Sequence, residues 1–181
     1  MMLSREDAFC VMIDMQEKLV PAIAHSEQLV ADCAMLLEGL RILGVPVLAS
    51  QQYTKGLGAT IPELESYTGG RPFEKITFSC WKDPKFREAA QAAGRKQVII
   101  CGTETHICVQ QTVLEMLEAG FEVYLITDCV GSRFDRDKEI AFDRMRQAGA
   151  ILTSAEAALF EMTVRGGSDV FKAISKLVKN R

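Results

Sequence analysis

Cys108 stands in the segment VIICGTETHICVQQTVLEML, where its surroundings favour reactivity. A buried strand is predicted to end at Gly102 and a helix to begin within a few residues, which puts Cys108 in the first helical turn. Unpaired backbone N–H groups and the positive end of the helix dipole stabilise a thiolate there, and the same N–H groups can receive an oxyanion. The position therefore predicts a thiol pKa below its usual value. It is equally compatible with a small buried residue at a helix start.

Two charged residues are candidates to activate this cysteine. Asp14 ends the apolar run AFCVMI, and Lys75 follows a long loop and precedes the short apolar run ITFS. A base, an ammonium group that stabilises negative charge, and a thiol together make a nucleophilic hydrolase site. The alternatives are that Asp14 caps the helix that follows it and that Lys75 is a solvated surface lysine.

The elements that must position these residues alternate between short apolar runs and longer amphipathic stretches, which predicts parallel strands joined by helices. The predicted strands are 8–13, 45–50, 97–101, 121–127 and 150–154, with a weaker one at 76–79. The predicted helices are 26–44, 84–94, 106–120, 135–149, 155–162 and 168–180, the last with Ser168 as its N-cap. The pattern predicts an α/β, three-layer Rossmann-like fold with a parallel sheet of about six strands and helices on both faces. Chemistry is expected at the carboxyl ends of the strands.

Length and composition narrow the class of protein. The chain has 181 residues and a formal net charge of −3, so we expect one domain over 1–181 and neither nucleic acid nor a membrane as partner. Its six cysteines form no Cys-x-x-Cys and no zinc-type spacing, which argues against a structural metal. Buried reduced thiols, a charged N-terminus and no long apolar span predict a cytoplasmic protein. The loop 51–75 is long enough to suggest a functional role.

These residues resemble a known family. Asp14 in VMIDMQEKL, Lys75 in RPFEKITFS and Cys108 in GTETHICVQQT are similar to the Asp-Lys-Cys triad of the isochorismatase-like cysteine hydrolases. The segments QQYTKGLGATIPEL and CGTETHICVQQT resemble the isochorismatase domain-containing subgroup. The resemblance extends from about residue 5 to about residue 178.

The resemblance implies a role for each residue. Asp14 would be the general base, Lys75 would hold the carboxylate and thiolate in register, and Cys108 would form a covalent acyl-enzyme. The backbone N–H groups of Glu104 and Cys108 would form the oxyanion hole, with a cis peptide between Thr103 and Glu104. The implied substrate is a small amide, ureido or related carbonyl compound, without a cofactor, and the implied assembly is a homo-oligomer.

Other residues are expected around the substrate. We predict that Gln51, Tyr53, Trp81 and Thr103 bind it, because they flank strand ends, and the side chain of Glu104 is a further candidate. Tyr53 and Trp81 could equally be core or subunit contacts.

Differences from related families narrow the class of reaction that we expect. The chain has only two histidines, His25 and His106, and lacks the Asp-x-His…His group of nicotinamidases, so no metal is expected. His106 lies two positions before Cys108, and residues two apart on a helix face different ways, which disfavours a Cys–His dyad.

The presence of the cysteine favours acyl chemistry. A vinyl-ether (isochorismate-type) hydrolase and a catalytically silent scaffold that binds a protein remain alternatives. No dinucleotide fingerprint or acidic phospho-acceptor pair is present.

Overall fold

The computed structural model describes residues 2–179 and contains a six-stranded parallel sheet. The strands lie in the order β3-β2-β1-β4-β5-β6. They are β1 (Ala8–Ile13), β2 (Val47–Gln52), β3 (Phe73–Lys75), β4 (Gln97–Thr103), β5 (Glu122–Gly131) and β6 (Ile151–Thr153). This confirms the predicted α/β, three-layer fold.

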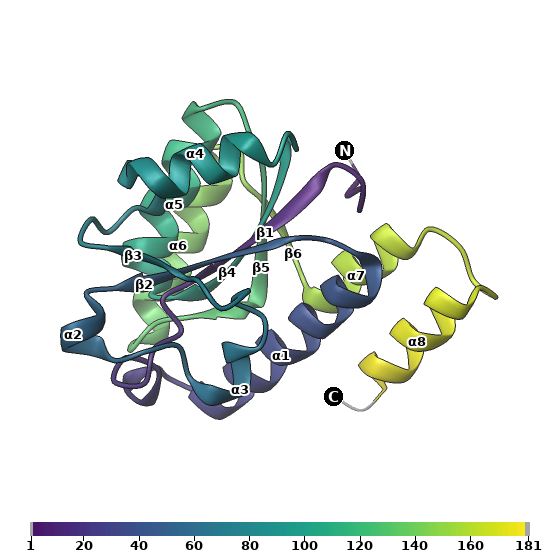
Figure 1. Cartoon of the computed structure of the whole chain (residues 1–181), viewed down its shortest axis with the longest axis horizontal. Coiled ribbons are helices and arrows are strands. Elements are labelled where there is room, and N and C mark those ends of the chain that lie inside the picture. The colour runs from purple at the N-terminus through teal and green to yellow at the C-terminus, as the bar shows by residue number, and fades with distance from the viewer. Residues whose placement is uncertain (1, 180–181) are drawn as a thin grey trace.

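Helices cover both faces of the sheet, as Figure 1 shows. One face carries α1 (Ser26–Leu43) and α7 (Ala155–Thr163), with α8 (Asp169–Val178) packed against both. The other face carries α4 (Pro84–Ala92), α5 (Gln110–Glu118) and α6 (Asp135–Gln147). Shorter segments are η1 (Val20–Ala22), α2 (Thr54–Leu57), α3 (Pro62–Glu65), η2 (Cys80–Lys82) and the π-helical η3 (Thr105–Val109).

The sheet separates two hydrophobic cores because successive strand residues point to opposite faces. In β1, Cys10 and Met12 belong to the core beneath α1 and α7, whereas Phe9 and Val11 belong to the core beneath α4, α5 and α6. All six residues of β1 are buried, as expected of a central strand covered on both faces.

The strand order places a crevice between two neighbouring strands. The chain moves outward from β1 through β2 to β3 and then returns to the other side of β1 as β4. At such a switch point the connections leave in opposite directions and open a crevice at the carboxyl ends of the strands. Asp14 follows β1 and Cys108 follows β4, so both residues lie at this crevice.

The structure corrects several predicted boundaries. Residues 76–79, predicted as a weak strand, are bends, and the edge strand is instead Phe73–Lys75. The predicted helix 106–120 is divided into η3 and α5, and the predicted loop 51–75 contains α2, α3 and two strand segments. The predicted cap is confirmed, since the Ser168 side chain accepts a hydrogen bond from the backbone of Phe171 at 3.0 Å. Residue 180 of the predicted last helix lies outside the described residues.

Candidate active site

Asp14 and Lys75 form a buried ion pair at the carboxyl edge of the sheet. The Lys75 Nζ atom lies 2.7 Å from the Asp14 Oδ2 atom, and the side chains are 1% and 0% exposed. Asp14 has a φ of 50°, a left-handed conformation that aspartate tolerates better than most residues and that turns the chain out of β1. Lys75 is the last residue of β3, and its side chain reaches across the end of β2 to Asp14.

Further hydrogen bonds fix both members of the pair. Lys75 also donates to Gln52 Oε1 at 2.8 Å and to the backbone carbonyls of Thr77 at 3.2 Å and Phe78 at 3.0 Å. Ser50 donates its hydroxyl to Asp14 Oδ1 at 2.7 Å. Burial is the largest influence on the pKa of Lys75 and lowers it, but the charge of Asp14, the neighbouring Cys80 and Cys108 thiols and the hydrogen bond to Asp14 together outweigh burial, so the net pKa is raised. The lysine is therefore charged and fully engaged with acceptors.

Cys108 lies in η3, beside this pair, and is 6% exposed. The π-helical turn is marked by a hydrogen bond from the Val109 amide to the Glu104 carbonyl at 3.2 Å, and such turns often occur at functional sites. Burial, followed by the negative charge of Asp14, raises the pKa of the Cys108 thiol well above its usual value, and Lys75 offsets this only in part. The predicted lowering of this pKa is therefore wrong for the resting protein.

The strand that leads to Cys108 is held tightly against β1. Gly102 has a φ of 117°, and a Cβ atom there would collide with the backbone of Ile13, so a glycine is required. Thr103 donates its hydroxyl to the Asp14 carbonyl at 2.9 Å, and the peptide bond between Thr103 and Glu104 is cis. These features join the end of β4 to the residue that carries the carboxylate.

Glu104 is tied to the loop that follows β5. It is 5% exposed, and its carboxylate accepts from the Arg133 backbone at 3.0 Å and from Arg133 Nε at 3.1 Å. The nearby His106 ring lies 2.9 Å from Ser132 Oγ and 3.9 Å from Asp137. The contacts of His106 therefore lie with this loop and α6.

The candidate active site is a cavity of about 150 Å³ at the crevice. Its lining combines apolar side chains with Asp14 and the cysteine and consists of Asp14, Leu19, Gln52, Leu57, Phe78, Glu104, Ile107 and Cys108. The cavity thus brings the predicted carboxylate and nucleophile together, and Lys75 adjoins it through its bond to Asp14.

None of the four residues predicted to bind substrate lines this cavity, whereas the further candidate Glu104 does. Gln51 is 8% exposed and its side-chain amide bonds Thr60. Tyr53 is 51% exposed and folds over Gly56, whereas Trp81 packs edge-on against Phe121 at 5.4 Å between ring centroids. Thr103 is fully buried and holds Asp14.

The sequence reasoning missed the two polar residues of β2 that support the pair, Ser50 and Gln52. The predicted strand ended at Ser50, but β2 continues to Gln52. Because alternate strand residues share a face, Ser50 and Gln52 both reach the pair, whereas Gln51 faces the other way. The rule that ligands meet the carboxyl ends of strands could have found Gln52 once the strand end was placed correctly.

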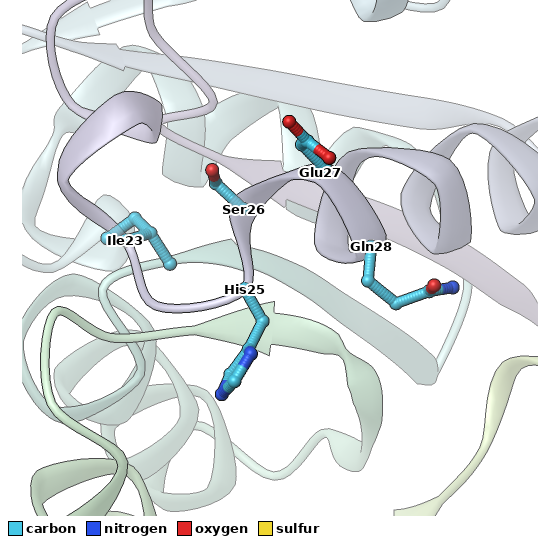
Figure 2. A pocket seen from close by; sticks show the side chains of 5 residues that line it. All are labelled: Ile23, His25, Ser26, Glu27 and Gln28. Carbon is cyan, nitrogen blue, oxygen red and sulfur yellow. The ribbon is translucent and has the colours of Figure 1, made fainter.

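A larger hollow lies elsewhere, at the start of α1. It measures about 550 Å³ and is lined by Ile23, His25, Ser26, Glu27 and Gln28. Figure 2 shows that His25 and Gln28 point to one side of the helix and Glu27 to the other. His25 bonds Asp135 at 3.3 Å and is 78% exposed. These side chains do not converge, and we place the candidate active site at Cys108 instead.

Two classes of site have no counterpart in the described residues. Within residues 2–179, no three His, Cys, Asp or Glu side chains are grouped so that they could hold a metal ion. No helix in the same range is long and apolar enough to cross a membrane.

Comparisons of sequence identify relatives of this chain. The family model of the isochorismatase domain matches residues 8–157. Isochorismatase domain-containing protein 1 of Salmo salar is 40% identical over 172 residues, covering 94% of this chain and 60% of that protein. The chain thus spans about 60% of the length of this relative. Isochorismatase domain-containing protein 2 of Danio rerio is 36% identical over 176 residues, covering 97% and 89%.

Solved structures show the same architecture. The MAR1 ribonuclease of Caenorhabditis elegans has a TM-score of 0.90 and 32% identity, with coverage of 99% of this chain and 93% of that one. Escherichia coli YcaC, described as an octameric hydrolase of unknown specificity, has a TM-score of 0.93 and 26% identity, with coverage of 99% and 90%. Pseudomonas aeruginosa YcaC, solved with hexane-2,5-diol and covalent acrylamide, has a TM-score of 0.89 and 25% identity, with coverage of 99% and 95%. The family match, the curated relatives and the shared fold agree, and the chain belongs to the isochorismatase domain family of hydrolase-fold proteins.

Proposed function

We propose that this protein is a cysteine-dependent hydrolase of a small amide, ureido or related carbonyl compound, with Asp14 as base, Lys75 as electrostatic stabiliser and Cys108 as nucleophile. The observation that carries the proposal is the buried Asp14–Lys75 pair, whose carboxylate lines the same cavity as Cys108. A buried ion pair is a weak source of stability, because desolvation offsets the attraction between the charges. Its place beside a thiol favours a chemical role.

The first half-reaction forms a thioester. The Cys108 thiol proton passes to the Asp14 carboxylate as Sγ attacks the carbonyl carbon, and the carbonyl electrons move onto oxygen. The backbone N–H groups of Glu104 and Cys108 receive this oxyanion. When it collapses, the C–N bond breaks, and the departing nitrogen takes the proton from Asp14. The products are an acyl-enzyme and ammonia or an amine.

The second half-reaction releases the acid. Asp14 takes a proton from water as the water oxygen attacks the thioester carbon. The C–S bond then breaks, the sulfur recovers the proton from Asp14, and the carboxylic acid leaves. Asp14 thus serves in turn as base and acid in each half-reaction.

The electrostatics of the cavity fit this exchange. At rest the site holds the Asp14 carboxylate, the Lys75 ammonium and a neutral Cys108 thiol, whose pKa is raised. After proton transfer it holds a neutral Asp14, the same ammonium and a thiolate. The net charge is unchanged, and Lys75 exchanges one anionic partner for another, so the low-polarity cavity never holds an unpaired charge.

The test is a turnover screen across primary amides, N-carbamoyl compounds and vinyl ethers. Wild type, Cys108→Ala and Cys101→Ala are assayed in parallel, Cys101 being another buried thiol that lies outside the cavity. We expect Cys108→Ala to abolish amide turnover and Cys101→Ala to retain it. Equal amide turnover by Cys108→Ala would overturn the proposal. Vinyl-ether turnover that survives in Cys108→Ala would favour the acid-catalysed alternative.

Relatives bear on this proposal in two ways. The P. aeruginosa YcaC structure holds covalent acrylamide, which supports a reactive nucleophile in that relative. The C. elegans relative is named a ribonuclease, but the net charge of −3 gives this chain no basic excess to attract a phosphate backbone.

The assembly and compartment are also proposals. The E. coli relative is an octamer, which supports a homo-oligomer here. All six cysteines are free thiols, which supports a reducing compartment such as the cytoplasm.

A further inference from the structure

We infer that the cavity at Cys108 accepts uncharged carbonyl compounds and excludes those that carry a carboxylate. The inference rests on the proposed function and adds to it the charge class of the substrate. It follows from the charged groups at the cavity wall and the partners that they already have.

No cation lines the cavity within the described residues. Its wall contains two carboxylates, Asp14 and Glu104, one amide, Gln52, and the thiol, and the remaining members are apolar. The apolar members are Leu19, Leu57, Phe78 and Ile107. A carboxylate that entered this space would lose its water and meet hydrocarbon and negative charge, which is costly without a partner.

Two cations that contact residues of the wall, Lys75 and Arg133, do not line the cavity and already have carboxylate partners. Lys75 carries three N–H donors, and four oxygen acceptors lie within 3.2 Å of its Nζ atom. Arg133 donates from its backbone and its Nε atom to Glu104. Releasing either cation toward a substrate would leave a buried carboxylate of the protein without its counter-charge.

The other polar groups of the wall are also engaged. The Gln52 amide donates to the Ile76 carbonyl at 2.8 Å while its oxygen accepts from Lys75. The backbone N–H groups of Glu104 and Cys108 are assigned to the reacting carbonyl oxygen in the proposed function. A second anionic group on the substrate would therefore find no cation on the wall and no backbone N–H group that the reacting carbonyl leaves free among those of Glu104 and Cys108.

Cavity size limits the substrate further. The volume is about 150 Å³, below the roughly 300 Å³ at which drug-sized ligand pockets begin and similar to a cavity that holds benzene. The substrate class is therefore a compact, uncharged amide or related carbonyl compound whose apolar body lies against Leu57, Phe78 and Ile107.

The test compares two alkylating reagents of nearly equal size, iodoacetamide and iodoacetate, which differ in charge. In each case Sγ of Cys108 bonds to the reagent carbon, iodide leaves, and the thiol proton passes to buffer. Labelling of the Cys108 peptide is followed by mass spectrometry at one alkaline pH, and each rate is divided by the rate for a free small thiol. We expect a preference for iodoacetamide of about tenfold or more, equivalent to about 1.4 kcal/mol.

Two variants make the comparison specific. Phe78 lines the cavity and is 54% exposed, so Phe78→Lys adds a cation at the wall without emptying the core. It should reduce the preference for iodoacetamide by about threefold, as expected for a partly solvated ion pair. Ile140→Lys adds the same charge at a residue of α6 that is 57% exposed and does not line the cavity. It should leave the preference unchanged.

Two outcomes would overturn the inference. One is equal normalised labelling of Cys108 by both reagents. The other is no labelling of folded Cys108 by either reagent when the unfolded chain is labelled, because the cavity would then not admit even this small amide. Neither outcome depends on turnover, so failure of the inference is separable from failure of the proposed function. If turnover is found, butyramide should be hydrolysed in preference to succinamate, in which a carboxylate replaces the methyl group.

Discussion

The six cysteines of this protein are divided between the two faces of the sheet, and the two groups have different surroundings. Cys10, Cys33, Cys101 and Cys129 belong to the core beneath α1 and α7. Cys80 and Cys108 belong to the core beneath α4, α5 and α6. All six are buried, so burial alone does not distinguish a structural thiol from a reactive one.

The neighbours of each sulfur make the difference. Cys10 and Cys101 lie 3.9 Å apart at Sγ, and Cys33 donates to the Cys129 carbonyl at 3.4 Å, so these thiols contact one another and the backbone. Cys80 instead bonds Ser50 at 3.4 Å, and Ser50 bonds Asp14. A thiol can react as a nucleophile when a base and a counter-charge lie close to it. Only Cys80 and Cys108 have both kinds of neighbour.

The largest expected effect comes from removing the counter-charge. Lys75→Met leaves the buried Asp14 carboxylate without its ion-pair partner, which should lower the free energy of unfolding by about 3–5 kcal/mol. Urea unfolding at neutral pH measures this. The control is Lys82→Met, which breaks a pair with Glu115 at 3.2 Å in which the lysine is 64% exposed. That change should cost less than about 1 kcal/mol.

A double variant separates charge from packing. Asp14→Asn combined with Lys75→Met replaces both charges by neutral groups of similar size, and it should recover most of the lost stability while remaining inactive. Wild-type stability in Lys75→Met alone would contradict the assignment of a charged, buried pair.

The next effect appears at alkaline pH. Burial, followed by the negative charge of Asp14, raises the pKa of Cys80 from 9.0 to about 11. The folded protein keeps its full stability below pH 9, where the Cys80 thiol is protonated in both the folded and the unfolded chain. It loses stability as the pH rises to about 11, because only the unfolded chain then releases the Cys80 proton easily. A shift of this size corresponds to about 3 kcal/mol.

Cys80→Ala should therefore flatten the alkaline decline in stability without abolishing it, since other buried thiols also have raised pKa values. Urea unfolding at several pH values between about 8 and 11 measures the slope. Met116→Ala removes a buried side chain that does not titrate and should lower stability equally at each pH. A slope in Cys80→Ala identical to that of wild type would contradict the prediction.

A smaller effect is expected from removal of the Ser50 hydroxyl, which lies between Cys80 and Asp14. Ser50→Ala removes the donor to Asp14 Oδ1 and should cost about 1–3 kcal/mol, the range for leaving a buried polar group unpaired. On the other face, Thr163 donates to the Leu159 carbonyl at 2.7 Å within α7. Thr163→Ala removes a neutral hydrogen bond there and should cost about 1 kcal/mol. Denaturant unfolding measures the stability of both variants. A larger loss of stability in Thr163→Ala than in Ser50→Ala would contradict the comparison.

The same contrast shows how far the sequence could predict this molecule. The apolar runs around Cys10 and Cys101 predicted buried central strands because continuous hydrophobic segments of that length require cover on both faces. Asp14 and Cys108 were predicted to meet because each follows one of these strands, and the cavity contains both.

What the sequence could not supply were quantities that depend on packing. Helix dipole arguments favoured a Cys108 thiolate, but burial and the nearby Asp14 charge raise the pKa of this thiol, and neither influence is visible in a local pattern. The edge strand was placed after Lys75 because a three-residue strand has too little periodicity to locate. Gln51 was chosen because the strand was predicted to end at Ser50, whereas β2 continues to Gln52, and a shift of one residue reverses the face to which a strand residue points.

The smallest expected effect concerns the structural thiols, which are the cysteines in the core beneath α1 and α7. Cys101→Ala removes a sulfur atom that contacts Cys10 and should lower the free energy of unfolding by about 1–2 kcal/mol, as for other modest core truncations. It should leave the alkylation rate of Cys108 unchanged, because Cys101 lies on the opposite face of the sheet and outside the cavity. Peptide-level labelling with iodoacetamide, read beside urea unfolding, measures both quantities on one sample. If Cys101→Ala clearly slowed Cys108 labelling, the two faces would be chemically coupled through β4, and the division between structural and reactive thiols would fail.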